Sequence, residues 1–327
     1  MKMCERKKKT IINWSTYNEG LKTRGSIQLI ITDAMLASWY NKQKRVGKGK
    51  PNVYSDSTVK YMMLISEVYS LPYRQTEGFL RELVRQQGHE GIETPVCSIM
   101  SKRPQNIDSE MLQIRQLRQR GEKIQLILDA SGIKVRGEHE WNERSHGKWR
   151  KRKWKKLHIG IDRDTRQIVA ATLTDNDVHD GEEFSKLLKQ AQAHGLSIDK
   201  CYADGAYSWH AHFDQLERSG ITPRITLPKN AIITGERKED AIMLKRHRDR
   251  ALIEMYDMGG MEVWKKKTDY HQRSLVENTF SRLKRIFGEF LSPKRDDVRY
   301  ARMMIRLELL NTFAAIALPQ YADIIAT

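Results

Sequence analysis

Four polar residues of different chemistry lie at helical spacing towards the end of the chain. The segment Tyr270–Phe287 contains neither glycine nor proline, and its apolar residues recur at intervals of three and four, which predicts a helix with one buried face. Beside that face run a phenol, a guanidinium, a carboxylate and an ammonium, supplied by Tyr270, Arg273, Glu277 and Lys284. Such a set could bind phosphates and a metal ion. Glu277 and Arg273 could equally form an ordinary i,i+4 surface pair.

Two aspartates could join Glu277 in one site. Asp129 stands in the middle of the apolar segment Lys123–Val135, where a charge is costly unless it is paired or coordinated. Asp204 ends a later predicted strand and precedes Gly205, a position where ligand sites of α/β sheets collect. Three clustered carboxylates offer the hard oxygen ligands that Mg²⁺ prefers, and two such ions can promote phosphoryl transfer. Taken singly, Asp129 could be a paired buried acid and Asp204 part of an ordinary turn.

The predicted elements that position these residues follow the order β-β-β-α-β-α-β-α. The strand Lys123–Val135 is apolar on both alternating faces in its middle, as expected of a central strand in a covered sheet. This order is that of the ribonuclease H-like α/β fold, and we expect a catalytic domain over residues 120–327. The polar segment 229–268 gives no clear pattern. The other predicted elements are a hairpin over 155–176, helices over 180–195, 209–219 and 298–318, and strands over 198–208 and 221–228.

Residues 1–108 are predicted to form an all-helical DNA-binding region. Apolar spacing predicts helices over 27–40, 57–69, 73–84 and 95–103, with Asp56 or Ser57 capping the second. Three compact helices with a basic last one resemble a helix-turn-helix module. An ordinary helical subdomain fits the same residues equally well.

The charge of the chain points to a polyanionic partner. Lysine and arginine number 58 against 41 aspartates and glutamates, which gives a net charge of +17. The excess is concentrated in the run Lys148–Lys156, where seven of the nine residues are basic and the other two are tryptophans. Contact with DNA phosphates and stacking on unpaired bases would explain this run, and a solvated surface is the plainer alternative. The residues predicted to contact DNA are Lys148, Trp149, Arg150, Lys151, Arg152 and Lys153.

Other site types find little support. The three cysteines lie far apart, which argues against a disulfide framework or a zinc finger, and no third ligand accompanies His139 and His146. No apolar run approaches the ~18 residues of a membrane span, and the start of the chain lacks the apolar core of a signal peptide. We therefore expect a soluble cytoplasmic protein with no membrane partner.

Together these residues resemble the DDE transposases of bacterial insertion sequences, in particular the insertion sequence five family. The third catalytic carboxylate of that group lies in the motif Y-x2-R-x3-E-x6-K, and Tyr270, Arg273, Glu277 and Lys284 have this spacing. The second is followed by Gly, then Ala or Asn, then Tyr, as in "DGAY" at 204–207. The segment 13–29 is also similar to the start of family members, so the resemblance covers most of the chain.

The resemblance implies catalytic, metal-binding roles for Asp129, Asp204 and Glu277, with Mg²⁺ as cofactor and Mn²⁺ as a substitute. It implies that Arg273 and Lys284 grip the phosphates of the strand that is cut, and that Tyr270 contacts the same backbone. Members of the family bind the terminal inverted repeats, cleave DNA, and join the freed 3′ hydroxyl to target DNA. A homodimer in a synaptic complex and association with the bacterial nucleoid are implied in the same way. A nuclease of the same fold, or a non-catalytic DNA-binding repressor, are the alternatives.

Overall fold

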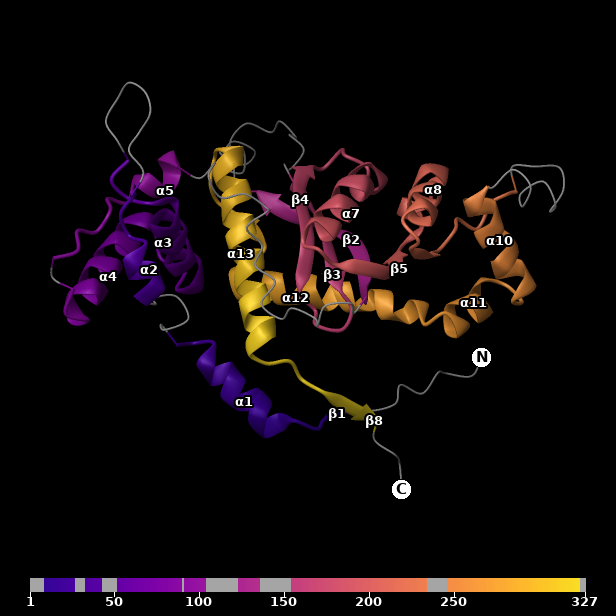
Figure 1. Ribbon diagram of the computed structural model, residues 1–327, viewed down its shortest axis with the longest axis horizontal. Helices are drawn as coiled ribbons and strands as arrows, with labels where there is room; N and C mark the ends of the chain where they lie inside the picture. The colour runs from indigo at the N-terminus through magenta and orange to yellow at the C-terminus, as the bar shows by residue number, and fades with distance from the viewer. Residues whose placement is uncertain are drawn as a thin grey trace, which may run out of the picture.

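The centre of the molecule is a mixed β-sheet, seen in a computed structural model that describes residues 9–26, 33–42, 52–89, 91–103, 123–135, 154–233 and 246–323. The strand order is β4-β3-β2-β5-β6, of which Figure 1 labels the first four. β7 pairs with the far end of β2. β2, β3 and β4 are antiparallel, whereas β5, β6 and β7 join in parallel. The strands are β2 (Lys123–Val135), β3 (Trp154–Asp162), β4 (Ile168–Asp175), β5 (Ser197–Ala203), β6 (Thr222–Ile225) and β7 (Phe290–Leu291). This topology matches the ribonuclease H-like arrangement expected from the sequence.

The two faces of β2 belong to separate hydrophobic clusters, which explains why this strand is apolar on both faces. Ile127 and Ile133 pack with α12 (Leu275–Phe287) and α13 (Asp296–Ile316). Leu126 and Leu128 pack with α7 (Phe184–Ala193) and α8 (His210–Arg218) on the opposite face. The sheet is therefore covered by helices on both sides, and the mixed α/β class is confirmed.

The N-terminal region consists mainly of helices and lies beside α13 (Figure 1). Its helices are α1 (Trp14–Thr23), α2 (Asp33–Ala37), α3 (Asp56–Val68), α4 (Tyr73–Gln86) and α5 (Ile99–Lys102). It is not all-helical, because β1 (Lys9–Ile11) pairs with β8 (Tyr321–Asp323). A partner more than 300 residues away leaves no local pattern in the sequence. The predicted boundary between residues 108 and 120 falls outside the described residues.

The helices of this region differ in detail from the prediction. Ser55, rather than Asp56 or Ser57, caps α3, since its hydroxyl accepts a hydrogen bond from Thr58 N at 3.1 Å. The expected helix 95–103 is reduced to the single turn of α5. A helix that short is a poor candidate for the recognition helix that enters a major groove. The helix-turn-helix interpretation stays a prediction, and α5 does not supply its recognition helix.

Buried ion pairs fasten α3 to α13. Lys60 Nζ lies 2.6 Å from Glu308 Oε2, and both side chains are 8 % exposed. Glu67 accepts hydrogen bonds from both Arg302 and Arg306, the latter at 2.7 Å. Pairs buried this deeply fix the register of the two helices, because a shifted register would leave uncompensated charges.

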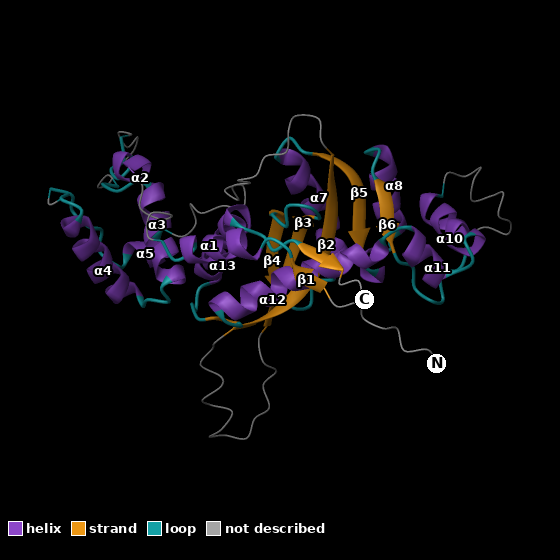
Figure 2. Cartoon of the chain, turned by 90° about the horizontal axis from the view of Figure 1, so that it is seen from below, coloured by secondary structure: helices purple, strands orange, loops and turns teal. Residues whose placement is uncertain are grey.

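The polar segment without a sequence pattern contains two helices, α10 (His247–Asp257) and α11 (Met261–Lys267). They lie at the opposite end of the molecule from α2–α5 (Figure 2). No helix in the described parts of the chain is long and apolar enough to span a bilayer.

Candidate active site

The register of two parallel strands brings Asp129 and Asp204 together. The last paired residues of β2 and β5 are Ile127 and Tyr202, and the two aspartates follow each of them at the same interval. Asp204 caps the short 3₁₀ helix η5 (Gly205–Tyr207), and its Oδ1 accepts a hydrogen bond from Ala206 N at 2.9 Å. The register therefore places Asp129, in the middle of β2, beside Asp204, which directly follows the end of β5.

Arg273 connects Asp129 to Glu277. It belongs to a 3₁₀ helix, η6 (Tyr270–Ser274), which leads directly into α12. Its Nη1 donates to Asp129 Oδ2 at 3.0 Å and its Nη2 to Glu277 Oε1, also at 3.0 Å. The Asp129 side chain is 15 % exposed and that of Glu277 is 59 % exposed, so one carboxylate is fixed in the fold and the other can reorient.

The charges of Asp204 and Glu277 act on the carboxyl group of Asp129. Burial raises the pKa of Asp129, and the negative charges of Asp204 and Glu277 add to that rise, against the opposing effects of Ala130 N–H and Arg273. Burial alone would lower the pKa of Arg273, but Asp129 and its neighbouring acids raise it overall. The acids predicted from the sequence thus form one electrostatic unit, with Arg273 as its cation.

The Tyr270 side chain is buried and makes hydrogen bonds within the protein. Its side chain is buried against Trp264, and its hydroxyl donates to Ala203 O at 3.2 Å and lies 3.2 Å from Thr226 Oγ1. These contacts anchor the start of η6 beneath the strand end that carries Asp204. The segment begins as a 3₁₀ helix, so its residues do not share the α-helical arc expected from the sequence. Contact of Tyr270 with DNA remains a prediction.

Lys284, on α12, contacts the strand that carries Asp129. Its Nζ donates to Ser131 Oγ at 2.9 Å, and Ser131 follows Asp129 by two residues on β2. An ammonium is therefore held on the same strip of the sheet as the carboxylates. The residues 148–153 of the basic run lie outside the described residues. Lys155 and Lys156, which follow them, pair with the acidic residues Asp175 and Asp180.

The donor chemistry of the site fits a divalent cation. Three carboxylates are near enough to influence one another, and two of them are bridged by a cation already. Within the described ranges, no three His, Cys, Asp or Glu side chains are close enough together to hold a metal ion. The position between Asp129 and Glu277 is taken by the guanidinium of Arg273. A metal ion would have to replace it there.

Two family models match the chain. One is described as a transposase DDE domain and covers residues 120–311, more than half of the 327 residues. The chain belongs to the DDE transposase family. The match contains all three acids of the site, and a second model with the same description covers residues 22–138. In this DDE transposase, the region matched by the second model extends from the N-terminal helices to β2. The narrower grouping with the insertion sequence five family stays a prediction.

The helix predicted over 180–195 begins differently from the prediction, with a cap that the sequence analysis did not single out. The residues before α7 form a 3₁₀ turn, η4 (Asp180–Glu183), which contacts η5 beside Asp204. Its cap is His179, whose ring accepts a hydrogen bond from Gly181 N while Glu182 accepts one from His179 N. The acid three residues after the cap is the available signal, but histidine is not among the usual capping residues.

Proposed function

We propose that this transposase binds the terminal inverted repeats of its insertion sequence and cleaves DNA with Mg²⁺ at Asp129, Asp204 and Glu277. The observation that carries the proposal is that Arg273 contacts both Asp129 on β2 and Glu277 on α12, while Asp204 at the end of β5 is near enough for its charge to act on Asp129. The freed 3′ hydroxyl then attacks target DNA at the same site. Mn²⁺ would serve as a substitute for Mg²⁺.

The residues of the site have different proposed roles. Asp129, Asp204 and Glu277 would hold the metal, which when bound supplies activation of the attacking oxygen and stabilisation of the leaving one. Asp129 is the fixed ligand because it is mostly buried, and Glu277 is free to turn towards the ion. No side chain of the site is a covalent nucleophile in this scheme, so positioning of the phosphodiester is the main task of the protein.

Arg273 and Lys284 are proposed to grip the phosphates of the strand that is cut. Arg273 is suited to bidentate contact with phosphate, and Lys284 offers a point charge. Both project from the segment that carries Glu277, and both are held near β2 by single polar contacts, to Asp129 and Ser131. The buried Tyr270 supports this arrangement by anchoring η6, in addition to any contact it makes with the backbone of DNA.

The proposed DNA-binding roles of the other regions rest on their charge and on their position in the chain. Residues 1–108 would recognise the element ends, and the run 148–153 would contact backbone phosphates. The net charge of +17 supports both assignments. A DNA-bound homodimer in a synaptic complex, working at the bacterial nucleoid, follows from the family rather than from the charge.

A strand-transfer assay tests the proposal against a nuclease without joining activity. A labelled element end with a free 3′ hydroxyl is mixed with the protein, Mg²⁺ and a supercoiled target plasmid. Covalent joining of the label to the plasmid is the expected result. Cutting without joining would indicate a simple nuclease, and binding without either reaction would indicate a repressor.

A further inference from the structure

The cap residue His179 has one ring nitrogen without a hydrogen-bond partner among the described residues, and the turn that it caps contacts η5, which follows Asp204. We propose that His179 is a further substrate-contacting residue, whose Nε2–H donates a hydrogen bond to a DNA phosphate held at the carboxylate site. This inference rests on the proposed function, because it requires a phosphodiester at Asp129 and Asp204. It adds a residue outside the carboxylate set and the basic motif.

The hydrogen bonds of the cap decide which ring nitrogen can donate. Gly181 N donates to His179 Nδ1 at 3.1 Å, so Nδ1 must carry a lone pair. The proton of the neutral ring therefore lies on Nε2. Within the described parts of the chain, Nε2 has no hydrogen-bond partner. A donor is thus available, and its tautomer is fixed by the backbone.

A column of stacked rings holds the imidazole in place. His179 stacks on Trp209 with ring centroids 5.3 Å apart and an angle of 22° between the ring planes. Trp209 stacks in turn on the buried His212, which stacks on Phe184. Gly181 allows the turn to lie against Trp209, since a Cβ there would be 2.8 Å from Trp209 Cε2. A ring fixed in this way loses little conformational entropy when it meets a substrate.

The turn that carries His179 is tied to the core on either side. Lys156 Nζ donates to Val178 O at 2.8 Å and lies 3.0 Å from Asp180 Oδ1. His212 Nδ1 lies 2.8 Å from Tyr207 O, which belongs to the turn following Asp204. The column of rings therefore links the His179 turn to the segment that positions Asp204.

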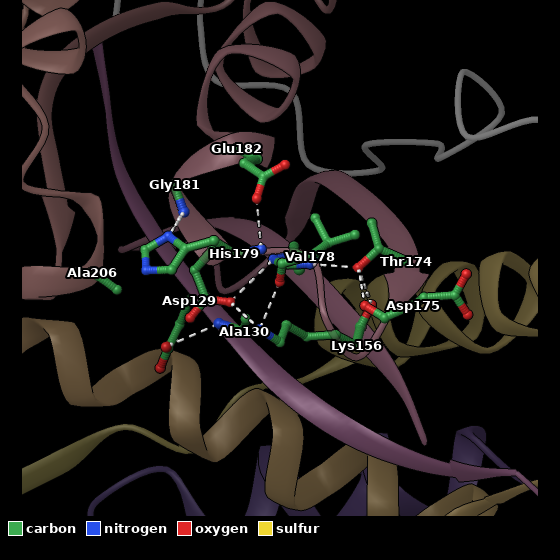
Figure 3. Close-up of polar contacts among 12 residues, drawn as sticks. Asp129, Ala130, Lys156, Thr174, Asp175, Val178, His179, Gly181, Glu182 and Ala206 are labelled. Atoms are coloured by element: carbon green, nitrogen blue, oxygen red, sulfur yellow. Dashed lines mark hydrogen bonds and ion pairs between the residues drawn. The ribbon is translucent and has the colours of Figure 1, made fainter. Parts of the chain in front are cut away.

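The position of the ring relative to the acids supports a substrate contact. Figure 3 draws the His179 turn in one view with Asp129 and Ala130, and the 3₁₀ turn that follows His179 contacts η5, which follows Asp204. Burial raises the pKa of Tyr207, and the charges of Asp180, Asp129 and Asp204 raise it further, so the cap turn and both aspartates surround one phenol. A phosphate drawn to the acids through a metal ion would come within the neighbourhood of this donor. A single preorganised donor of this kind affects rates strongly.

Two substitutions separate a donor from a plain helix cap. In His179→Asn the side-chain oxygen can replace Nδ1 as the cap acceptor, but nothing replaces Nε2. In His179→Gln the longer amide can place an N–H where Nε2 was, and the cap is weakened. Nicking of end-containing DNA, equilibrium binding of the same DNA and the thermal midpoint are measured on each preparation.

If His179 is a hydrogen-bond donor to DNA, the two variants rank in one order by nicking rate. If it is only a helix cap, they rank in the opposite order. We expect His179→Asn to keep the midpoint and DNA binding while nicking about 10²-fold more slowly, and His179→Gln to recover much of that rate despite a lower midpoint. Wild-type nicking by His179→Asn, or no recovery in His179→Gln, would overturn the inference. Asp204→Asn is assayed in parallel. If it still cuts, the proposed function fails; if it is inactive while His179→Asn cuts normally, only the role of His179 fails.

Discussion

The guanidinium of Arg273 lies 3.0 Å from the carboxylate of Asp129, although 144 residues separate the two in the sequence. The same guanidinium reaches Glu277, so one cation holds two of the three acids at the site. This contact explains how a mostly buried acid can persist in the middle of an apolar strand. It also places Arg273 in competition with any metal ion that binds between the two carboxylates.

Replacing Arg273 by Gln should therefore tighten Mg²⁺ binding to the free protein. Removal of a competing cation of this kind is expected to lower the dissociation constant roughly 3- to 10-fold, since about 1.4 kcal/mol corresponds to a factor of ten. The rise of the thermal midpoint during a Mg²⁺ titration measures this affinity without any DNA. DNA nicking should nevertheless fall, because the phosphate grip is lost.

Arg81→Gln supplies the matched control, because it removes the same charge from an exposed side chain on α4 that also pairs with a carboxylate. It should leave the Mg²⁺ titration unchanged. Weaker or unaltered Mg²⁺ binding in Arg273→Gln would show that the guanidinium does not occupy the metal position.

Glu67→Gln should destabilise the whole molecule, because it leaves the charges of Arg302 and Arg306 without their buried partner. The side chains of Glu67 and Arg306 are only 3 % and 6 % exposed. Breaking such a pair costs about 3 kcal/mol or more in the free energy of unfolding. Denaturant unfolding measures this cost. Glu82→Gln, which breaks an exposed pair on α4, should leave stability essentially unchanged. Equal midpoints for the two variants would argue against α3 and α13 unfolding as one unit.

Replacing Arg150, Lys151, Arg152 and Lys153 by Ala should flatten the salt dependence of DNA binding. If all four contact phosphates, the slope of log K against log salt should fall by roughly 3–4. Lys186→Ala with Lys189→Ala on α7 serves as a control for loss of charge elsewhere. A slope equal to that of the wild type would show that the basic run does not contact phosphates and would favour its interpretation as a solvated surface.

The strands were the most predictable part of the fold. β2 runs over the segment Lys123–Val135 expected from its apolar pattern, and the hairpin of β3 and β4 falls where a short turn separates two apolar runs. Asp129 could be singled out because a charge among apolar residues is costly by itself. The short spacing of Arg273 and Glu277 likewise made their pairing predictable.

Other features depend on contacts that a local pattern does not contain. The first five residues of the segment from Tyr270 form a 3₁₀ helix, where the Tyr270 hydroxyl is fixed by Ala203 at the end of β5 and by Thr226 just after β6. α10 buries only a few side chains, so its sequence reads as polar. The bridge from Arg273 to Asp129 and the place of His179 both arise from tertiary packing.

The central claim is that Asp129, Asp204 and Glu277 form one metal-dependent catalytic site, and Asp204→Asn tests it most directly. Asn keeps the shape of the side chain and an oxygen that can accept from Ala206 N, while it removes the charge that would hold Mg²⁺. Mg²⁺-dependent nicking of end-containing DNA is measured beside binding of the same DNA. The account predicts wild-type binding with no nicking. Binding together with nicking at the wild-type rate would place the catalytic site elsewhere.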